Sequence, residues 1–394
     1  MCFFANAGDG NDSISIDASA FSYVGPSSLR GDTGNDTLVA PNQDDFASYV
    51  DGGIGNDSLV ATGAGGAGAI PQTTLSYLAA TGAVTVDLGS GRAYGADGND
   101  SFSGFLRAEG SNSDDSLLGG ASREALLGGG GNDTLDGGIG DDWLSGGGGI
   151  NWASYARATD SVTVNLAAGI SDGADGIDNL QSIQNVLGGN SADEIRGNNS
   201  ANLLDGGSGA GNDTLNAFGG NDTLIGGLGD DSVAGGSGTD WASYANASSG
   251  ITVNLGVGTS SGADGNDSLT GIENVLGGNG NDFIQGNSLA NVLNGGAGDD
   301  TISGGAGNDL LDFGAGNENY LRGASETGND TLIGGDGNDT LDLQANWSFL
   351  SESGGFSLYQ DEADTIYAQS WESVVCFAEG TRIVTPSRLL KFVA

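Results

Sequence analysis

The chain has 394 residues, of which 76 are glycine and 37% are hydrophobic, so glycine, which has no side chain to bury, takes up about a fifth of the sequence. Its 52 acidic side chains outnumber 10 basic ones and give a net charge of -42. This balance excludes a single thick hydrophobic core. It also argues against nucleic acid or an anionic membrane surface as a direct partner, because few side chains can pair with phosphate.

Residue types used in catalysis are scarce. The chain has no histidine, which removes zinc protease motifs, Ser-His-Asp and Cys-His arrangements and most acid–base schemes. Paired carboxylates are abundant enough for a glycosidase-like pair, but repeat spacing accounts for every prominent Asp. Cys2 and Cys376 lie at opposite ends and cannot make a disulfide framework. We therefore expect no enzymatic activity and no cofactor other than a metal.

Residues 1–75 contain three copies of a Gly-Asp motif, around Asp12, Asp36 and Asp57, separated by uneven spacers. We interpret this part as irregular repeats with bulging loops. The N-terminus has no basic region or long apolar stretch, so no Sec signal peptide is indicated, and no segment is long and apolar enough for a membrane span. Because the chain starts inside a repeat and stops abruptly, one interpretation is that it is a fragment of a longer protein.

A larger duplication occupies the middle of the chain. Residues 151–207 align without gaps on residues 240–296 and are identical at more than half of the positions, and a weaker copy starts at Tyr77. We therefore divide this part into modules at 76–150, 151–239 and 240–342, the last including terminal repeats. Each copy carries an alternating strand such as VTVNL, in which Val162, Val164 and Leu166 share one face. These segments are interpreted as wider coils that continue a solenoid.

Aromatic residues recur in each of the two closest copies, as the sequence WASY. They comprise Trp152, Tyr155, Trp241 and Tyr244. Carbohydrate stacking is one interpretation, but we favour packing at the ends of the repeat runs, because large aromatic side chains usually contribute buried area.

A nine-residue repeat organises the chain most clearly between residues 206 and 242. Asp213, Asp222, Asp231 and Asp240 stand nine residues apart, each followed two places later by a small or aliphatic residue. The unit is GGxGxDxUx, with U apolar. Its glycines permit positive φ and let main-chain carbonyls approach one point, to which the Asp adds a carboxylate. Calcium prefers such hard oxygen ligands, about six to eight of them.

The same motif recurs along most of the chain and identifies a set of candidate calcium ligands. A disordered Gly/Asp-rich linker would have no reason to keep an apolar residue at a fixed place after each Asp. The candidate ligands are Asp12, Asp36, Asp57, Asp100, Asp133, Asp142, Asp178, Asp213, Asp222, Asp231, Asp240, Asp267, Asp282, Asp300, Asp309, Asp330 and Asp339.

This pattern resembles the RTX, or haemolysin-type, calcium-binding repeat. The resemblance implies an all-β fold, a right-handed parallel β-roll in which two nonapeptides make one coil and each calcium ion lies between successive turns on one side. It pairs Asp213 with Asp231 and Asp222 with Asp240. About ten such ions would cancel about twenty negative charges, so folding and binding would be one event. Sites that use Asn291 or Glu318 should be weaker.

The composition changes after residue 342. Residues 343–375 are rich in aromatic and branched residues around Gly354-Gly355, which indicates a small antiparallel cap over the open end of the roll. The sequence CFAEGTRIVTP from Cys376 resembles the first block of Hint domains, in which a leading Cys attacks the preceding carbonyl. Splicing also needs a downstream Thr/His pair, and the chain lacks histidine. We therefore interpret 376–394 as the truncated start of a Hint domain with an inert Cys376; a chance strand is the alternative.

Three functions remain open. The first is a secreted calcium-binding module with a structural, surface or adhesive role. The second is the noncatalytic carrier portion of a secreted RTX enzyme or toxin, and the third is a Hint self-processing precursor. The RTX resemblance implies export from a Gram-negative bacterium by a one-step transporter that reads a C-terminal signal. Calcium ions are the expected partners, with end-to-end self-association or extracellular polysaccharide as further candidates; nucleic acid and membrane insertion are not expected.

Overall fold

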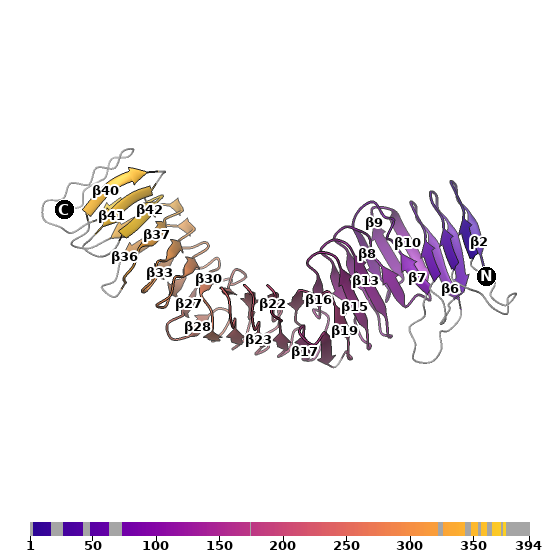
Figure 1. The fold of residues 1–394 in the computed structure, drawn as a ribbon, viewed down its shortest axis with the longest axis horizontal. Coiled ribbons are helices and arrows are strands. Elements are labelled where there is room, and N and C mark those ends of the chain that lie inside the picture. Colours follow the sequence, from indigo (N-terminus) through magenta and orange to yellow (C-terminus); the bar gives the residue numbers. More distant parts are fainter. Residues whose placement is uncertain are drawn as a thin grey trace. The chain divides into compact units, whose positions relative to one another are not determined.

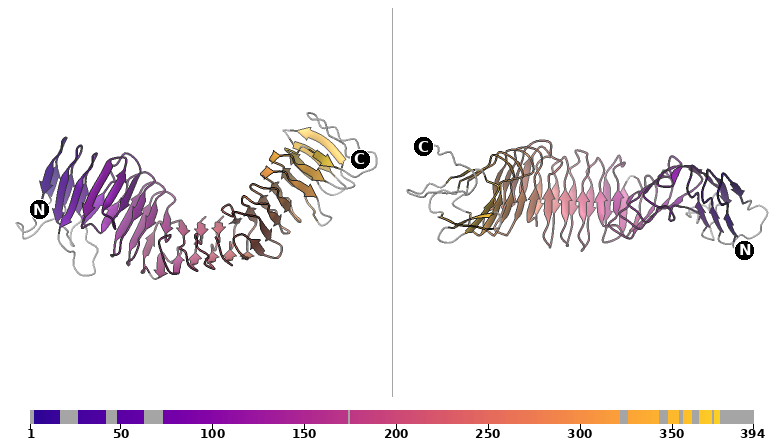
Figure 2. Two further views of the ribbon diagram at one scale, coloured as in Figure 1. Left: turned by 180° about the vertical axis from the view of Figure 1, so that it is seen from behind. Right: turned by 90° about the horizontal axis from the view of Figure 1, so that it is seen from above.

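The structure, a computed structural model, describes residues 3–16, 27–41, 48–62, 73–173, 175–321, 326–342, 348–353, 356–360, 365–371 and 373–375. These residues form short strands joined by turns, and no helix occurs among them. They divide into two units, residues 1–197 and 198–394, with a boundary inside the module predicted at 151–239. Within each unit the strands stack as successive rungs in two sheets (Figures 1 and 2).

Two sheets make up the first unit. Sheet I contains β1 (Phe3–Asn6), β3 (Ser27–Arg30), β5 (Ser48–Asp51), β7 (Thr73–Ser76), β11 (Arg107–Glu109), β13 (Ala125–Gly129), β15 (Trp143–Gly147), β17 (Val162–Asn165), β18 (Ile170–Gly173), β19 (Asn179–Gln181) and β21 (Glu194–Arg196). Sheet II contains β2 (Ser13–Ser15), β4 (Thr37–Pro41), β6 (Ser58–Thr62), β8 (Val84–Asp87), β9 (Arg92–Gly95), β10 (Gly98–Ser103), β12 (Ser116–Leu118), β14 (Thr134–Asp136), β16 (Trp152–Ser154) and β20 (Asn185–Leu187).

The second unit repeats this arrangement. Sheet III contains β23 (Thr214–Asn216), β25 (Ser232–Ala234), β27 (Ile251–Asn254), β28 (Thr259–Gly262), β29 (Ser268–Thr270), β31 (Phe283–Gln285) and β33 (Thr301–Ser303). Sheet IV contains β22 (Leu203–Asp205), β24 (Thr223–Ile225), β26 (Trp241–Ser243), β30 (Asn274–Leu276), β32 (Val292–Asn294), β34 (Leu310–Asp312), β37 (Asp330–Ile333), β40 (Ser348–Ser353), β41 (Phe356–Gln360) and β42 (Thr365–Gln369). The remaining strands are β35 (Ala315–Gly316), paired with β38 (Asp336–Gly337), and β36 (Asn319–Leu321), β39 (Thr340–Asp342) and β43 (Ser373–Val375).

The nine-residue period explains the strand pairing. Two repeats return the chain to the same sheet, so β23 pairs in parallel with β25 and Leu215 lies opposite Val233. In the next sheet, Leu224 lies opposite Ala242. Most three-residue strands turn their middle side chain inward: Leu215, Leu224, Val233 and Ala242 are each at most 2% exposed. The core is therefore a thin column of single apolar residues, renewed at every rung, and the predicted parallel β-roll is confirmed.

The duplicated modules depart from the predicted wider coils, because each contains an antiparallel strand. In the second module the chain passes from β16 to β17, returns through β18, which is antiparallel to both β17 and β19, and then continues in β19. Strand β19 pairs with the earlier β15, and β17 pairs with the later β21. Along the sheet, β19, β18 and β17 thus follow β15 in reverse chain order. Strands β8–β10 and β27–β29 repeat the pattern.

The expected alternation in the second module is present but shorter than predicted. Val162 and Val164 are buried and Thr163 is exposed, whereas Leu166 is only half-buried because β17 ends at Asn165. The antiparallel strands of the first and second modules lie in different sheets: β8–β10 belong to sheet II, whereas β17–β19 belong to sheet I. The same module can therefore be built into either sheet.

The C-terminal end is antiparallel, as predicted for residues 343–375. Strand β40 pairs with β41 and β41 with β42 in antiparallel fashion, and β42 joins the roll by pairing in parallel with β37. The predicted Gly354-Gly355 turn lies outside the described residues. Trp371 packs edge-on against Phe313, with 5.2 Å between ring centroids. Three antiparallel strands thus extend sheet IV beyond its last parallel nonapeptide strand.

Candidate metal centre

Most acidic residues of the repeat end a Gly-rich turn, directly before a strand. In the turn that leads to Asp231, Gly227 and Gly229 have φ of 94° and 141°, which residues with a Cβ rarely adopt. A Cβ built on Gly226 would lie 2.4 Å from Asp231 Oδ2. The carboxylate therefore folds back over its own turn, into space that exists only because residue 226 is glycine.

The first carboxylate oxygen links one coil to the next. The amide of Asp213 donates to Asp231 Oδ1 at 2.7 Å, and the amide of Asp222 donates to Asp240 Oδ1 at 2.8 Å, both across 18 residues. The structure thus brings together the two pairs derived from the RTX resemblance. Other pairs linked in this way are Asp12–Asp36, Asp36–Asp57, Asp57–Asp100, Asp282–Asp300, Asp309–Asp330 and Glu318–Asp339.

The second carboxylate oxygen faces a main-chain carbonyl of a neighbouring coil. A Cβ built on Gly128 would lie 2.2 Å from Asp133 Oδ2 and 2.6 Å from the carbonyl oxygen of Gly146. Around Gly206, the corresponding distances are 2.3 Å to Asp213 Oδ2 and 2.4 Å to the carbonyl oxygen of Gly226. Two hydrogen-bond acceptors from different coils therefore converge on one point, an arrangement that a cation would stabilise.

Many of these second oxygens are buried and accept no hydrogen bond from the described residues. Buried polar atoms of this kind are rare in proteins and call for a partner, because burying an ionised carboxylate alone is very costly. They are Oδ2 of Asp36, Asp57, Asp133, Asp142, Asp222, Asp231, Asp240 and Asp300, together with Oε2 of Glu124 and both Oε atoms of Glu318.

Burial raises the pKa of these carboxyl groups. Desolvation is the largest cause for Asp57 and Asp142, whose pKa values rise to about 7, and for Asp231, whose pKa rises to about 6. Glu124 reaches a pKa of about 8, because the charge of Asp142 adds to desolvation. Without a cation, the folded chain therefore resists the full ionisation of its turns.

The donor set suits a hard divalent cation. Among the described residues, no group of three or more His, Cys, Asp or Glu side chains gathers to hold a metal ion. Turns such as those of Asp133 and Asp213 instead bring a carboxylate beside a main-chain carbonyl, and both groups are ligands of calcium and not of soft metals. Oxygens without donors, cradles that a Cβ would fill and raised carboxyl pKa values all fit calcium. Bound there, a calcium ion supplies positive charge between two coils.

Four predicted ligands have donors on both carboxylate oxygens. Asp282 accepts the amides of Ile251 and Gly278, each at 2.9 Å. Asp100, Asp178 and Asp267 each accept a main-chain amide on Oδ1 and a tyrosine hydroxyl on Oδ2. Their assignment as ligands remains a prediction.

The other predicted ligands also lie at turn ends. Asp12 is half-buried, and its amide donates to Asp36 Oδ1 at 2.8 Å. The remaining four are buried: Asp213, Asp309, Asp330 and Asp339. The predicted positions therefore lie at the end of a turn between coils or, for Asp100 and Asp330, within the strand that follows the turn.

Sequence reasoning missed Glu124 as a ligand candidate. Glu124 is 3% exposed, and its amide donates to Asp142 Oδ1 at 2.7 Å. It lies nine residues before Asp133, so the spacing of the repeat could have found it, although the local sequence SREAL replaces GNDTL.

A second ladder, on the exposed side of the turns, was also missed. It uses the residue before the repeat Asp: the amide of Asn56 donates to Asn35 Oδ1 at 2.9 Å, and the amide of Asn99 donates to Asn56 Oδ1 at 2.8 Å. These side chains join successive turns by neutral hydrogen bonds. The frequent Asn-Asp pairs of the sequence are its signal.

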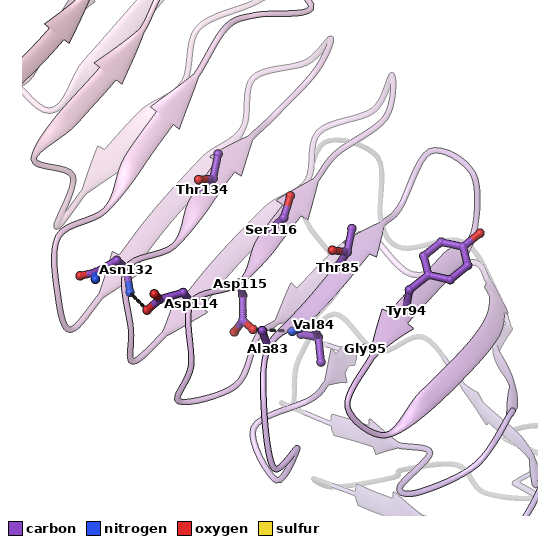
Figure 3. A pocket seen from close by; sticks show the side chains of 10 residues that line it. All are labelled: Ala83, Val84, Thr85, Tyr94, Gly95, Asp114, Asp115, Ser116, Asn132 and Thr134. Carbon is purple, nitrogen blue, oxygen red and sulfur yellow. Dashed lines mark hydrogen bonds between the residues drawn. The ribbon is translucent and has the colours of Figure 1, made fainter. Parts of the chain in front are cut away.

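A hollow lies on sheet II beside β8 and β12 (Figure 3). Hydroxyl groups of Thr85, Ser116 and Thr134 line it, and Tyr94 stands at one side. Asp115 also lines the hollow. It accepts the amide of Val84 at 2.7 Å and both the amide and the hydroxyl of Ser111, so neither of its oxygens lacks a donor. The hollow is therefore not part of the candidate metal centre.

The tyrosines of WASY are buried, as the packing interpretation predicts, whereas the tryptophans are only half-buried. Tyr155 and Tyr244 are each 6% exposed, which leaves little ring surface for a sugar, and Trp152 and Trp241 are half-buried on the outer strand faces.

Comparison with known families agrees with the geometry. The family of RTX calcium-binding nonapeptide repeats, in four copies, matches residues 107–135, 118–153, 184–210, 208–242, 270–288, 285–317 and 325–345. No curated protein matches the chain. The comparison does not support the Hint resemblance at Cys376, and residues 376–394 lie outside the described residues. The stacked turns, their open carboxylates and these matches together show that the chain carries RTX calcium-binding repeats.

Proposed function

We propose that this protein is a secreted structural module without catalytic activity, which folds outside the cell when calcium binds between its coils and then serves at a surface or in adhesion. The observation that carries the proposal is the set of buried carboxylate oxygens, such as Asp133 Oδ2, that accept no hydrogen bond from described residues and face a carbonyl of another coil.

The charge of the chain explains why folding would depend on calcium. A net charge of -42 disfavours any compact state, and the core offers only one apolar side chain per short strand. Each ion held by a turn such as that of Asp231 would offset part of this repulsion at the place where two coils meet. Ligands that bind only the folded state stabilise it by mass action, so many weak sites together can drive folding.

A role outside the cell is consistent with the affinity expected for such sites. Extracellular calcium modules bind at roughly 0.1–1 mM, far above the range of intracellular sensors. Low occupancy inside the cell would keep the chain unfolded before export, in agreement with the RTX pattern. No helix in the described part of the chain is long and apolar enough to cross a membrane.

The proposal is tested by following compactness and β-structure with and without calcium. In excess chelator we expect an expanded chain with a weak β signal in circular dichroism, and at about 1–10 mM calcium a compact chain with a strong one. Magnesium at the same concentration serves as the control for charge screening. A sedimentation coefficient and a spectrum that do not change between chelator and calcium would refute the proposal.

A further inference from the structure

Three buried tyrosines donate to carboxylates at the turn ends. The hydroxyl of Tyr77 donates to Asp100 Oδ2 at 2.8 Å, and that of Tyr155 donates to Asp178 Oδ2 at 3.1 Å. In the third module Tyr244 donates to Oδ2 of its own acidic partner, Asp267, at 3.0 Å. In all three cases 23 residues separate donor and acceptor. The contact is therefore a fixed feature of the module.

These carboxylates are saturated, in contrast to those of the preceding rungs. Asp100 Oδ1 accepts the amide of Asp57 at 2.8 Å, and Asp178 Oδ1 accepts the amide of Asp142 at 3.0 Å. Asp178 Oδ2 also accepts the hydroxyl of Ser171 at 2.8 Å. Asp57 and Asp142, by comparison, each keep a buried Oδ2 that accepts no hydrogen bond from the described residues. Carboxylates with a donor on both oxygens, which we call closed, thus lie next to carboxylates with a donor on only one oxygen, which we call open, on the adjacent coil.

The tyrosine reaches across the interior of the roll. Tyr77 follows β7 in sheet I and bonds Asp100 in β10 of sheet II, whereas Tyr155 follows β16 in sheet II and bonds Asp178 beside β19 of sheet I. The same contact thus forms in both modules, although the tyrosine follows a strand of sheet I in one and a strand of sheet II in the other. Burial and the neighbouring carboxylate raise the pKa of Tyr77, so that its hydroxyl keeps its proton and remains a donor.

We propose that Tyr77, Tyr155 and Tyr244 take the place of calcium at one turn of each module, so that these three rungs form without metal. Asp100, Asp178 and Asp267 then bind the hydroxyl instead of calcium. The proposal rests on the proposed function, in which the remaining turns need calcium to fold.

The composition of the modules supports a metal-independent rung. Strands β8, β9 and β10 follow one another directly and pair antiparallel, so their contacts are local and form at a low cost in chain entropy. Val84, Val86, Ala93 and Phe102 of these strands, and Phe105 just after them, are all at most 8% exposed, so this segment buries five apolar side chains. A closed carboxylate therefore coincides with the part of the chain that has the best independent core.

Hydrogen exchange of the full chain in chelator tests the proposal. In wild type we expect slow exchange in residues 84–103 and fast exchange in the open-turn run 206–240. Tyr77→Phe removes the only hydroxyl that donates to Asp100 Oδ2 among the described residues. Exchange at 84–103 should then become about tenfold faster or more, because a buried carboxylate oxygen loses its donor. The control is Tyr94→Phe, since the Tyr94 side chain is half exposed and lies in the same stretch.

Calcium distinguishes the proposed role of the hydroxyl from a packing role. In Tyr77→Phe the freed carboxylate should accept a cation, so calcium should restore slow exchange at 84–103 and raise the number of bound ions by about one. Equal exchange in Tyr77→Phe and Tyr94→Phe in chelator, or a defect that calcium does not relieve, would overturn the proposal.

The wild-type protein gives a further test that needs no variant. Fast exchange at 84–103 in chelator would overturn the tyrosine proposal alone, provided that calcium still slows exchange at 206–240. Slow exchange at 206–240 in chelator would instead refute calcium-dependent folding, so the two failures are distinguishable.

Discussion

Asp231→Ala removes a carboxylate that serves two coils at once. Asp231 is 3% exposed, its Oδ1 accepts the amide of Asp213 at 2.7 Å, and its Oδ2 accepts no hydrogen bond from the described residues. Alanine leaves the Asp213 amide without its acceptor and removes a ligand candidate between the coils. The effect should therefore extend to the neighbouring site that contains Asp213.

The magnitude follows from these two losses. A hydrogen bond to a charged acceptor contributes about 1.5–3 kcal/mol. A site with a Kd of roughly 0.1 mM contributes about 1.4 kcal/mol at about 1 mM calcium. We therefore expect the free energy of unfolding in calcium to fall by about 3–4 kcal/mol. If about ten ions bind during folding, this loss corresponds to about 0.35 kcal/mol per ion and raises the calcium concentration at the folding midpoint about 1.8-fold.

Calcium titrations followed by circular dichroism test this prediction. Thr214→Ala is the matched control, because Thr214 lies next to the same site but its side chain is exposed on β23. Asp231→Asn keeps an oxygen acceptor for the Asp213 amide but removes the charge, so its midpoint should lie between those of the wild type and the alanine variant. Equal midpoints for Asp231→Ala and Thr214→Ala would refute the pairing of coils through this carboxylate.

Three further predictions concern the turn, the core and the pH dependence. Gly226→Ala places a Cβ 2.4 Å from a carboxylate oxygen and should weaken calcium-induced folding as strongly as loss of that carboxylate. Gly148→Ala is the control, because its Cβ would have no other atom closer than 3.9 Å. Equal calcium midpoints for the two variants would contradict this prediction. Leu224→Ala should lower the unfolding free energy in calcium by about 2–5 kcal/mol in denaturant titrations, and less than about 1 kcal/mol would argue against a single-file core. In chelator, burial raises the pKa of Asp57 to about 7 and that of Glu124 to about 8, whereas both pKa values are near 4 in an unfolded chain. The folded chain therefore binds more protons, and its residual structure should lose stability as the pH rises from about 4 to about 8. A thermal unfolding midpoint that rises over this pH range would contradict the prediction.

The repeat period was sufficient to predict much of the fold. A spacing of nine residues fixes which residues share a turn, so the pairs Asp213–Asp231 and Asp222–Asp240 could be derived once the repeat was identified as a β-roll. The apolar residue after each Asp fixes the strand face that points inward, as Leu215 does. Both features are local, and local patterns are what a periodic sequence encodes.

The antiparallel strands of the modules could not be predicted in the same way. Alternation in VTVNL indicates a strand at Val162–Asn165 but not the direction or identity of its partner. That partner, β18, carries the sequence ISDG, which has no strand signal of its own, and its neighbour β19 returns to an earlier rung. Pairings that reverse the chain order depend on tertiary packing, which a single sequence does not display.

The tyrosine contacts were hidden for a related reason. Tyr155 precedes Asp178 by 23 residues, which matches neither the nine-residue period nor its double, so the repeat spacing does not connect the two residues. The sequence did indicate that Tyr155 is buried, but the donor role of its hydroxyl depends on which turn the ring reaches across the interior.

The two kinds of rung explain how so acidic a chain could begin to fold. In a uniform row of open turns, the first ion would have to join two coils that repel each other and bury little apolar surface, so the first step would be the least favourable one. A rung closed by a tyrosine hydroxyl, such as Tyr155 on Asp178, already holds two coils together and aligns the open carboxylate of Asp142 beside it. The next ion then meets a preformed partner on one side, so binding should spread outward from the modules into the nonapeptide runs.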